Sequence, residues 1–223
     1  MMSKMIDSFK KELTENGYSV TEITPELLSV DNFLSKEQLD TFWNIINNTS
    51  QEDWEIEYFA NLKTFCMTKF GRDDVDNLVA EGKFEITQNW KDKNFNIMHE
   101  EIHAPMYNNL NSMVVSSNPN LHLSGLATIQ RMQPGVELKS HTDQHTDPSI
   151  VYATIIYLND DYIDGELFFP NLDITLKPKS GTLLFFPGNE EYQHGVKHVG
   201  EGPIRYVLVG FIKENNHYLK NRY

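Results

Sequence analysis

Between residues 150 and 212 the chain reads IVYATIIYLNDDYIDGELFFPNLDITLKPKSGTLLFFPGNEEYQHGVKHVGEGPIRYVLVGFI. Five runs rich in β-branched and aromatic residues lie in this stretch, and turn signals at 159–161, 170–171, 178 and 187–188 separate them. Two similar runs precede it, LATIQRM (126–132) and VELKS (136–140), on either side of a Pro-Gly turn. Seven short strands with no helix between them predict an antiparallel sandwich or barrel.

The region before residue 121 has a helical pattern instead. Residues 31–48, DNFLSKEQLDTFWNIINN, carry apolar side chains at steps of three and four, and Ser35 with Gln38 forms a capping box. A second helix is expected over residues 96–113, which Pro105 interrupts or kinks, whereas residues 51–93 show no assignable pattern. We therefore expect a single domain over residues 1–223, with a helix-rich part at 1–120 and a β core at 121–223.

The composition is that of a folded globular protein. Of the 223 residues 39% are hydrophobic, including 13 Phe and 10 Tyr, so the chain can bury a sizeable core. No apolar run is long enough to predict a transmembrane helix, and the segment MMSKMIDSFKKELTENG has charges where a signal peptide needs apolar residues. The single Cys66 cannot form an internal disulfide, which favours a reducing compartment such as the cytoplasm. The sequence does not indicate an oligomeric state.

The charge balance disfavours a nucleic-acid partner. The chain has 19 Lys and Arg against 32 Asp and Glu, which gives a formal net charge of −13. Proteins bind polyanions by neutralising phosphates with Lys and Arg, and here no basic run is longer than two residues.

Candidate metal ligands lie in the heptapeptide HTDQHTD at 141–147, which contains two overlapping His-x-Asp triplets. One interpretation is a polar loop of turn-forming residues. The other is a metal site, because a strand continuing through His141 would project His141 and Asp143 from one face. His194, just beyond the strand at 182–186, can supply a third ligand. Two imidazoles and one carboxylate form the facial triad of non-haem Fe(II) oxygenases.

Arg205 is a second candidate functional residue. In the alternating run IRYVLVGFI it shares a strand face with Val207 and Val209. A buried guanidinium needs an anionic partner, and no acidic residue of the chain is an obvious one, so the carboxylate of a bound cosubstrate is a candidate. The alternative is an arginine that extends to solvent from the rim of a barrel.

These residues belong to a longer set of motifs: PGVELKSHTD, ATIIYLND, DGELFFP, ITLKPKSGTLLFF and HGVKHVGEGPIRYVLVGF. In their order and spacing they resemble the Fe(II)- and 2-oxoglutarate-dependent dioxygenases, most closely the prolyl 4-hydroxylase-like branch. DNFLSKEQLD resembles the helix with which such domains often begin. The resemblance implies an α+β fold with a mainly β core, a double-stranded β-helix (jelly roll) on which N-terminal helices pack.

The resemblance also implies residue roles. His141, Asp143 and His194 match the iron ligands, with His141 preferred to His145 by its spacing from Gly135. Arg205 matches the residue that holds the far carboxylate of 2-oxoglutarate, and Tyr157 matches a tyrosine that contacts the same carboxylate. The implied cofactor is Fe(II), with 2-oxoglutarate and O2 as cosubstrates and ascorbate as a candidate reductant. The sequence departs from the pattern at Met132, where a tyrosine is common, and in having Asp164 before Gly165 in place of a second glycine.

The implied reaction is hydroxylation of an unactivated C–H bond, with a prolyl residue in a peptide or protein as the first expectation. A free amino acid or another small molecule is the alternative substrate. Two other classes remain open. His99, Glu100 and His103 satisfy the H-E-x-x-H motif of zinc proteases, although Glu101 and the nearby Pro105 argue against it. A β-barrel that binds metal without redox chemistry is the third class, and Arg205 argues against that one.

Overall fold

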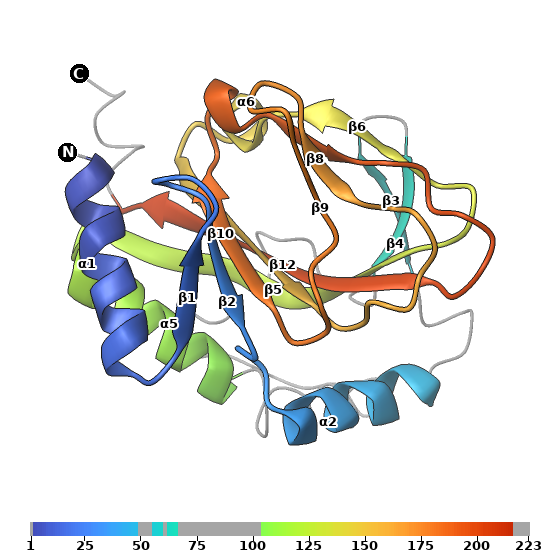
Figure 1. The fold of residues 1–223 in the computed structure, drawn as a ribbon, viewed down its shortest axis with the longest axis horizontal. Helices are drawn as coiled ribbons and strands as arrows, with labels where there is room; N and C mark the ends of the chain where they lie inside the picture. The colour runs from blue at the N-terminus through green and yellow to red at the C-terminus, as the bar shows by residue number, and fades with distance from the viewer. Residues whose placement is uncertain (1, 49–54, 60–61, 67–103, 216–223) are drawn as a thin grey trace.

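The structure is a computed structural model that describes residues 2–48, 55–59, 62–66 and 104–215. Two antiparallel sheets form most of it (Figure 1). The large sheet has the order β1-β2-β10-β7-β12-β5-β4-β3 and the small sheet the order β6-β11-β8-β9. No helix within these ranges is both long and apolar enough to span a lipid bilayer.

The strands of the large sheet are β1 (Ser19–Glu22), β2 (Leu28–Asp31), β3 (Glu55–Phe59), β4 (Leu62–Cys66), β5 (Leu121–Met132), β7 (Ile150–Tyr157), β10 (Leu183–Pro187) and β12 (Arg205–Glu214). Those of the small sheet are β6 (Leu138–His141), β8 (Leu167–Phe169), β9 (Ile174–Leu176) and β11 (His194–Val196). The central strands β7 and β10 are apolar almost throughout because both faces of the large sheet are covered.

Alternation along these strands separates two cores. On β7 the side chain of Ile156 packs in the core beneath the helices, whereas Ile155 packs in the core between the two sheets. On β10 Phe185 and Phe186 divide in the same way. The second core also takes Leu167 and Val196 from the small sheet, so it is the interior of a sandwich.

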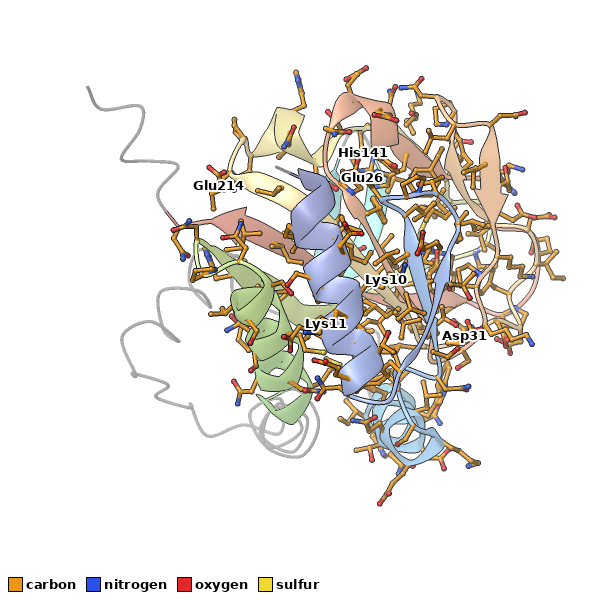
Figure 2. The ribbon with its side chains drawn as sticks, turned by 60° about the vertical axis from the view of Figure 1, so that its left-hand side comes forward. Lys10, Lys11, Glu26, Asp31, His141 and Glu214 are labelled. Carbon is orange, nitrogen blue, oxygen red and sulfur yellow. The ribbon has the colours of Figure 1, made fainter. Side chains whose placement is uncertain are left out.

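Three helices cover the outer face of the large sheet: α1 (Met2–Glu15), α2 (Lys36–Asn47) and α5 (Ala104–Ser117). Figure 2 shows α1 beside α5 over this face. The Phe9 ring of α1 stacks on Phe185 of β10, with their centroids 4.4 Å apart. The helices therefore stabilise the sheet from outside and leave its inner face to the second core.

The helix expected over residues 31–48 is shorter than predicted. Asp31 is the last residue of β2, and the helix begins at Lys36 after Ser35, whose side chain completes the capping box with Gln38. The expected helix at 96–113 lies partly outside the described residues. Its described part, α5, begins at Ala104, so Pro105 stands in the first turn, where it interrupts no backbone hydrogen bond.

All seven predicted strands are present, as β5 to β10 and β12. The predicted fold class, a mainly β jelly-roll core with N-terminal helices packed on it, is confirmed. The sequence did not indicate β1 and β2, which extend the large sheet beside β10, nor the three-residue β11 in the small sheet.

Candidate metal centre and its cavity

Three candidate ligands converge at one end of the sandwich. His141 is the last residue of β6, His194 is the first of β11, and these two residues are direct partners in the small sheet. Asp143 follows two residues after His141. One ligand atom from each of the three residues lies within 4.8 Å of the others. The structure thus brings together the three residues that the sequence analysis singled out.

The local path of the chain at Asp143 differs from our expectation. We expected a strand to continue through His141 to Asp143, but β6 ends at His141 and Asp143 begins the short helix α6 (Asp143–Thr146). The change of direction occurs at Thr142, whose backbone is extended. The turn buries the Asp143 side chain to 5% exposure and directs its carboxylate toward both imidazoles. The proximity was predicted correctly, but the reason for it was wrong.

Backbone carbonyls orient both imidazoles. The Nδ1 atom of His194 lies 3.1 Å from the carbonyl oxygen of Tyr192, and Nδ1 of His141 lies 3.0 Å from that of Lys139. A carbonyl only accepts, so each Nδ1 carries the hydrogen and each Nε2 keeps a lone pair. These Nε2 atoms lie 3.8 Å (His141) and 3.9 Å (His194) from the Asp143 carboxylate. Contacts of this kind commonly fix the ring orientation of metal-binding histidines.

Electrostatics at the cluster favour the metal-binding form of His194. Burial lowers the pKa of His194, and the charge of Asp143 opposes this only in part. The imidazole is therefore neutral at neutral pH, as a metal ligand must be. The Asp143 Oδ2 atom is buried and has no hydrogen-bond partner among the described residues. A cation between the three side chains would satisfy it.

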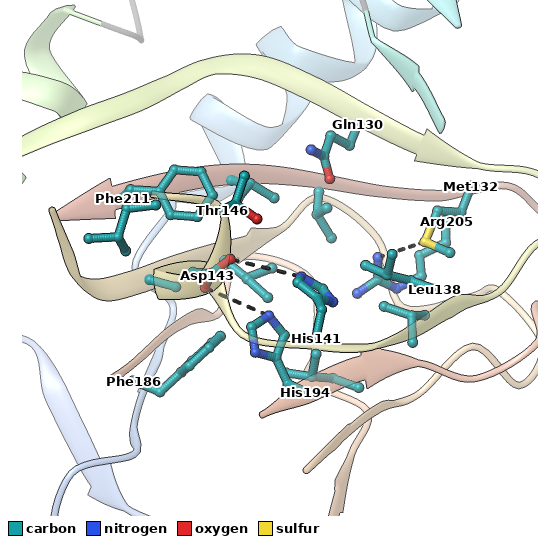
Figure 3. A pocket seen from close by; sticks show the side chains of 17 residues that line it. Gln130, Met132, Leu138, His141, Asp143, Thr146, Phe186, His194, Arg205 and Phe211 are labelled. Atoms are coloured by element: carbon teal, nitrogen blue, oxygen red, sulfur yellow. Dashed lines mark hydrogen bonds and ion pairs between the residues drawn. The ribbon is translucent and has the colours of Figure 1, made fainter. Parts of the chain in front are cut away.

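A cavity of about 270 Å³ opens beside the three side chains. Figure 3 shows it between the two sheets, with Asp143, His141 and His194 on one side and Arg205 on the other. Most of its wall is apolar and comes from both sheets, with Leu138, Ile150, Ala153, Ile155, Leu167, Phe186, Val196, Val207, Val209 and Phe211. The predicted common face of Arg205, Val207 and Val209 is thus the face that lines the cavity.

Arg205 is buried, with 2% exposure. Its Nη2 donates a hydrogen bond to the Tyr157 hydroxyl at 3.1 Å, and its Nη1 approaches the Met132 sulfur at 3.5 Å. Its Nε has no hydrogen-bond partner, and no acidic side chain forms an ion pair with it within the described part of the chain. The interpretation as an arginine at a solvent-exposed rim is therefore wrong, and the guanidinium is a buried cation without an anionic partner among the described residues.

Tyr157 contacts this guanidinium but is not among the residues that line the cavity. Burial raises the pKa of the Tyr157 phenol, and the Arg205 charge opposes the rise. The hydroxyl consequently stays protonated at neutral pH. It accepts a hydrogen bond from Arg205 and still has its own hydrogen to donate.

The other described sequence candidates, His145 and Asp147, are not part of the cluster. His145 is exposed, and Asp147 accepts hydrogen bonds from Ser149 and pairs with Lys213 at 3.3 Å. His99, Glu100 and His103 of the zinc-protease motif lie outside the described residues.

Sequence reasoning missed Gln130, whose amide points from β5 into the cavity (Figure 3). Gln130 lies two residues before Met132 and therefore on the same strand face, and this spacing could have predicted its position in the cavity wall.

Comparisons with known proteins agree with this geometry. Residues 127–213 match the family model of the 2OG-Fe(II) oxygenase superfamily, a segment that includes all three candidate ligands and Arg205. Human prolyl 3-hydroxylase 2 is 38% identical over 65 residues, which are 27% of this chain and 9% of that protein. The match thus spans less than a tenth of that relative.

Solved structures share the fold across most of the chain. One is a prolyl hydroxylase of Trichoplax adhaerens in complex with a peptide fragment of the hypoxia inducible factor oxygen degradation domain (TM-score 0.63, 14% identity, 99% of this chain and 94% of that one). Another is a prolyl-4-hydroxylase of Pseudomonas putida (TM-score 0.53, 15% identity, 96% and 99% coverage).

The sandwich therefore has the jelly-roll fold of these solved structures. The match of residues 127–213 to the model of the 2OG-Fe(II) oxygenase superfamily agrees with the sequence resemblance. The cofactor of this superfamily is Fe(II), and its cosubstrates are 2-oxoglutarate and O2. The His-Asp-His cluster has the donor set that Fe(II) requires there.

Proposed function

We propose that this protein is an Fe(II)- and 2-oxoglutarate-dependent dioxygenase that hydroxylates a prolyl residue in a peptide or protein. The proposal treats residues 1–223 as one catalytic domain, with helices α1, α2 and α5 supporting the sheet that carries the cavity. The observation that supports it best is the pairing of two features in one cavity: a His-Asp-His cluster and a buried guanidinium without an anion.

His141, Asp143 and His194 are the proposed iron ligands. Their two Nε2 atoms and the carboxylate occupy one side of a prospective ion, and the cavity lies on the other side. Such a facial arrangement leaves positions for cosubstrate and dioxygen. Bound Fe(II) would supply the activation of O2 coupled to oxidative decarboxylation of 2-oxoglutarate to succinate and CO2. The chain itself holds the ligands in place through the carbonyls of Lys139 and Tyr192.

Arg205 is the proposed partner of the far carboxylate of 2-oxoglutarate. A guanidinium can form two parallel, charge-assisted hydrogen bonds with a carboxylate, and Nε together with one Nη presents such a pair. Tyr157 orients this guanidinium by accepting a hydrogen bond from Nη2, and its own hydrogen remains available for the same carboxylate. The anion would thereby neutralise Arg205, which is the one lysine or arginine among the described residues that line the cavity.

The cavity wall supports a neutral substrate group. We take Asp143 as an iron ligand and Arg205 as the partner of the cosubstrate. Apart from these two residues and the two histidine ligands, no described residue that lines the cavity has an ionisable side chain. The ammonium and carboxylate of a free amino acid would then have no counter-charges there, and burial of unpaired charges is unfavourable. A prolyl ring within a peptide is apolar and fits such a wall. The prolyl hydroxylases among the similar structures point in the same direction.

A free amino acid or other small molecule is the second candidate substrate, and a metal-binding barrel without redox chemistry is the third possibility. The buried Arg205 argues against the latter, because a bare metal site does not require a guanidinium beside it. Ascorbate as the reductant and a cytoplasmic location complete the proposal. The location rests on the single cysteine.

The test is to incubate the full chain with Fe(II), ascorbate, O2 and 2-oxoglutarate, with and without a panel of proline-containing peptides and free proline. The proposal predicts succinate release that a peptide stimulates, with one oxygen atom added to that peptide by mass spectrometry. Stimulation by free proline and by no peptide would favour the small-molecule alternative. Metal binding without any release of succinate would favour the third possibility, a metal-binding barrel without redox chemistry.

A further inference from the structure

A second tyrosine beside Arg205 has no role in the function proposed above. Tyr162 lies in the loop between β7 and β8 with 1% exposure and, like Tyr157, is not among the residues that line the cavity. Its hydroxyl lies near the Arg205 guanidinium, which can only donate, so its own hydrogen has no acceptor among the described residues. The Arg205 guanidinium carbon lies 5.7 Å from the centroid of the Tyr162 ring and 5.1 Å from that of Tyr157. Two phenol rings therefore lie close to the Arg205 guanidinium.

The loop holds the Tyr162 ring in this position. Lys177 donates a hydrogen bond to the backbone carbonyl of Tyr162, and its ammonium lies 4.8 Å from the ring centroid. Gly165 packs close to both residues: a Cβ there would be in contact with Tyr162 and Arg205 and would approach Cγ2 of Val199 to 3.0 Å. The backbone of Gly165 also has φ +64, which side chains rarely adopt.

The same loop is fixed to the strand that carries Arg205. The Asn159 side chain accepts a hydrogen bond from the backbone N–H of Tyr206 and donates one to the carbonyl of Ile204. These two residues flank Arg205 in the sequence. These hydrogen bonds tie the start of the loop that carries Tyr162 to the backbone on both sides of Arg205.

The chemistry of the two groups indicates what is missing. Burial raises the pKa of Tyr162 to about 12, and the nearby Arg205 guanidinium opposes the rise, so the phenol is protonated at neutral pH. Arginine only donates, and its Nε has no acceptor among the described residues. A buried O–H and a buried N–H without acceptors destabilise the folded state unless a ligand supplies an acceptor.

We propose that Tyr162 donates a hydrogen bond to the same anion that Arg205 holds, and so forms part of the cosubstrate carboxylate site. The inference rests on the proposed function, which makes that anion the far carboxylate of 2-oxoglutarate. Tyr157 then orients the guanidinium, and Tyr162 adds a neutral donor from the loop. The expected preference is for a 2-oxo acid with a second carboxylate over one that ends in a methyl group.

The test compares two ligands that differ only at that end, 2-oxoglutarate and 2-oxovalerate. Each is titrated calorimetrically, directly or by displacement, into the anaerobic full chain loaded with Mn(II). Tyr162→Phe keeps the ring and removes the hydroxyl, so it should weaken 2-oxoglutarate binding about 10-fold, the effect of one hydrogen bond to a charged group. Binding of 2-oxovalerate should not change, and the thermal midpoint of the ligand-free variant should not fall.

Tyr152 provides a matched control. It is also 1% exposed with a hydroxyl that has no partner among the described residues, but it stacks on Phe185 in the core beneath the helices, away from Arg205. Tyr152→Phe should leave the affinity for both ligands at the wild-type value. Equal affinity of wild type and Tyr162→Phe for 2-oxoglutarate would overturn the inference, as would equal weakening of both ligands. Failure of the wild type to bind 2-oxoglutarate would instead overturn the proposed function.

Discussion

The Nε2 atom of His194 lies 3.9 Å from Oδ2 of Asp143, and that carboxylate oxygen has no hydrogen-bond partner among the described residues. The two residues come from different elements, a strand of the small sheet and the start of a short helix. Their spacing is too long for a hydrogen bond but suits two atoms that share a metal ion. The fold thus holds the proposed ligands apart by the distance that an ion would bridge.

The first prediction concerns the ligands. His141→Ala, Asp143→Ala and His194→Ala should each abolish stoichiometric Fe(II) or Mn(II) binding, because a facial site of three ligands loses its chelate when one is removed. Metal content after dialysis measures this directly. The control variants are His145→Ala, which changes an exposed side chain, and Asp147→Ala, which removes the ion pair with Lys213. Both should retain the metal, and loss of metal in His145→Ala alone would mean that the wrong triplet was chosen.

The sequence was sufficient to locate seven strands and the three clustered residues, since β-rich runs between turns mark those strands and the His-x-Asp spacing marks the site. It did not show the turn at Thr142 that places Asp143, because four-residue helices have no periodic signal. Nor did it show β1, whose residues are mostly exposed and which depends on pairing with β2. Tyr162 was missed because only tertiary packing brings it to Arg205.

The second prediction concerns pH. Burial lowers the pKa of His194, so the unfolded chain takes up this proton at a higher pH than the folded protein does. Above the ordinary histidine pKa of about 6.5 both states are neutral, and below it protonation favours the unfolded state. The metal-free protein should therefore lose up to about 1.4 kcal/mol of unfolding free energy per pH unit below that value from this residue. Urea unfolding at pH 7.5 and 5.5 should show a smaller loss in His194→Gln; an equal loss in both proteins would contradict the assignment.

The third prediction concerns the cation in the cavity. Arg205→Ala should weaken 2-oxoglutarate binding by roughly 2–5 kcal/mol, the scale of truncating one partner of a buried charge pair. Arg205→Lys should weaken it less, because lysine keeps the charge but loses the planar pair of donors. Metal affinity should change little in either variant. Calorimetric titration of the anaerobic Mn(II) protein decides the matter, and wild-type affinity in Arg205→Ala would remove the carboxylate site from this account.

The fourth prediction concerns Gly195 of β11, the strand of the small sheet that pairs with β6 on one side and β8 on the other. A Cβ at Gly195 would lie 2.5 Å from the Leu138 carbonyl oxygen and 2.8 Å from the Phe168 ring, so β11 could not keep its place between β6 and β8. Gly195→Ala should cost about 1–3 kcal/mol of unfolding free energy, as overpacking does. It should also lower metal affinity because it displaces the adjacent His194.

A glycine remote from the cavity serves as the comparison for that variant. Gly17 has φ +86, and no described atom lies within 4 Å of the place that a Cβ on this residue would take. Gly17→Ala should cost about 1–2 kcal/mol from backbone strain alone and leave metal affinity unchanged. Metal affinity that falls equally in the two variants, or in neither, would contradict the proposed link between strand spacing and the ligand cluster.

The most direct test of the central claim is succinate formation from 2-oxoglutarate by the purified chain, compared with Asp143→Ala under the same conditions. With Fe(II), O2 and ascorbate, and with the panel of prolyl peptides present, the wild type should release succinate, and omission of Fe(II) or the Asp143→Ala change should abolish it. A wild-type protein that binds Fe(II) stoichiometrically and yet releases no more succinate than Asp143→Ala would contradict the proposed function.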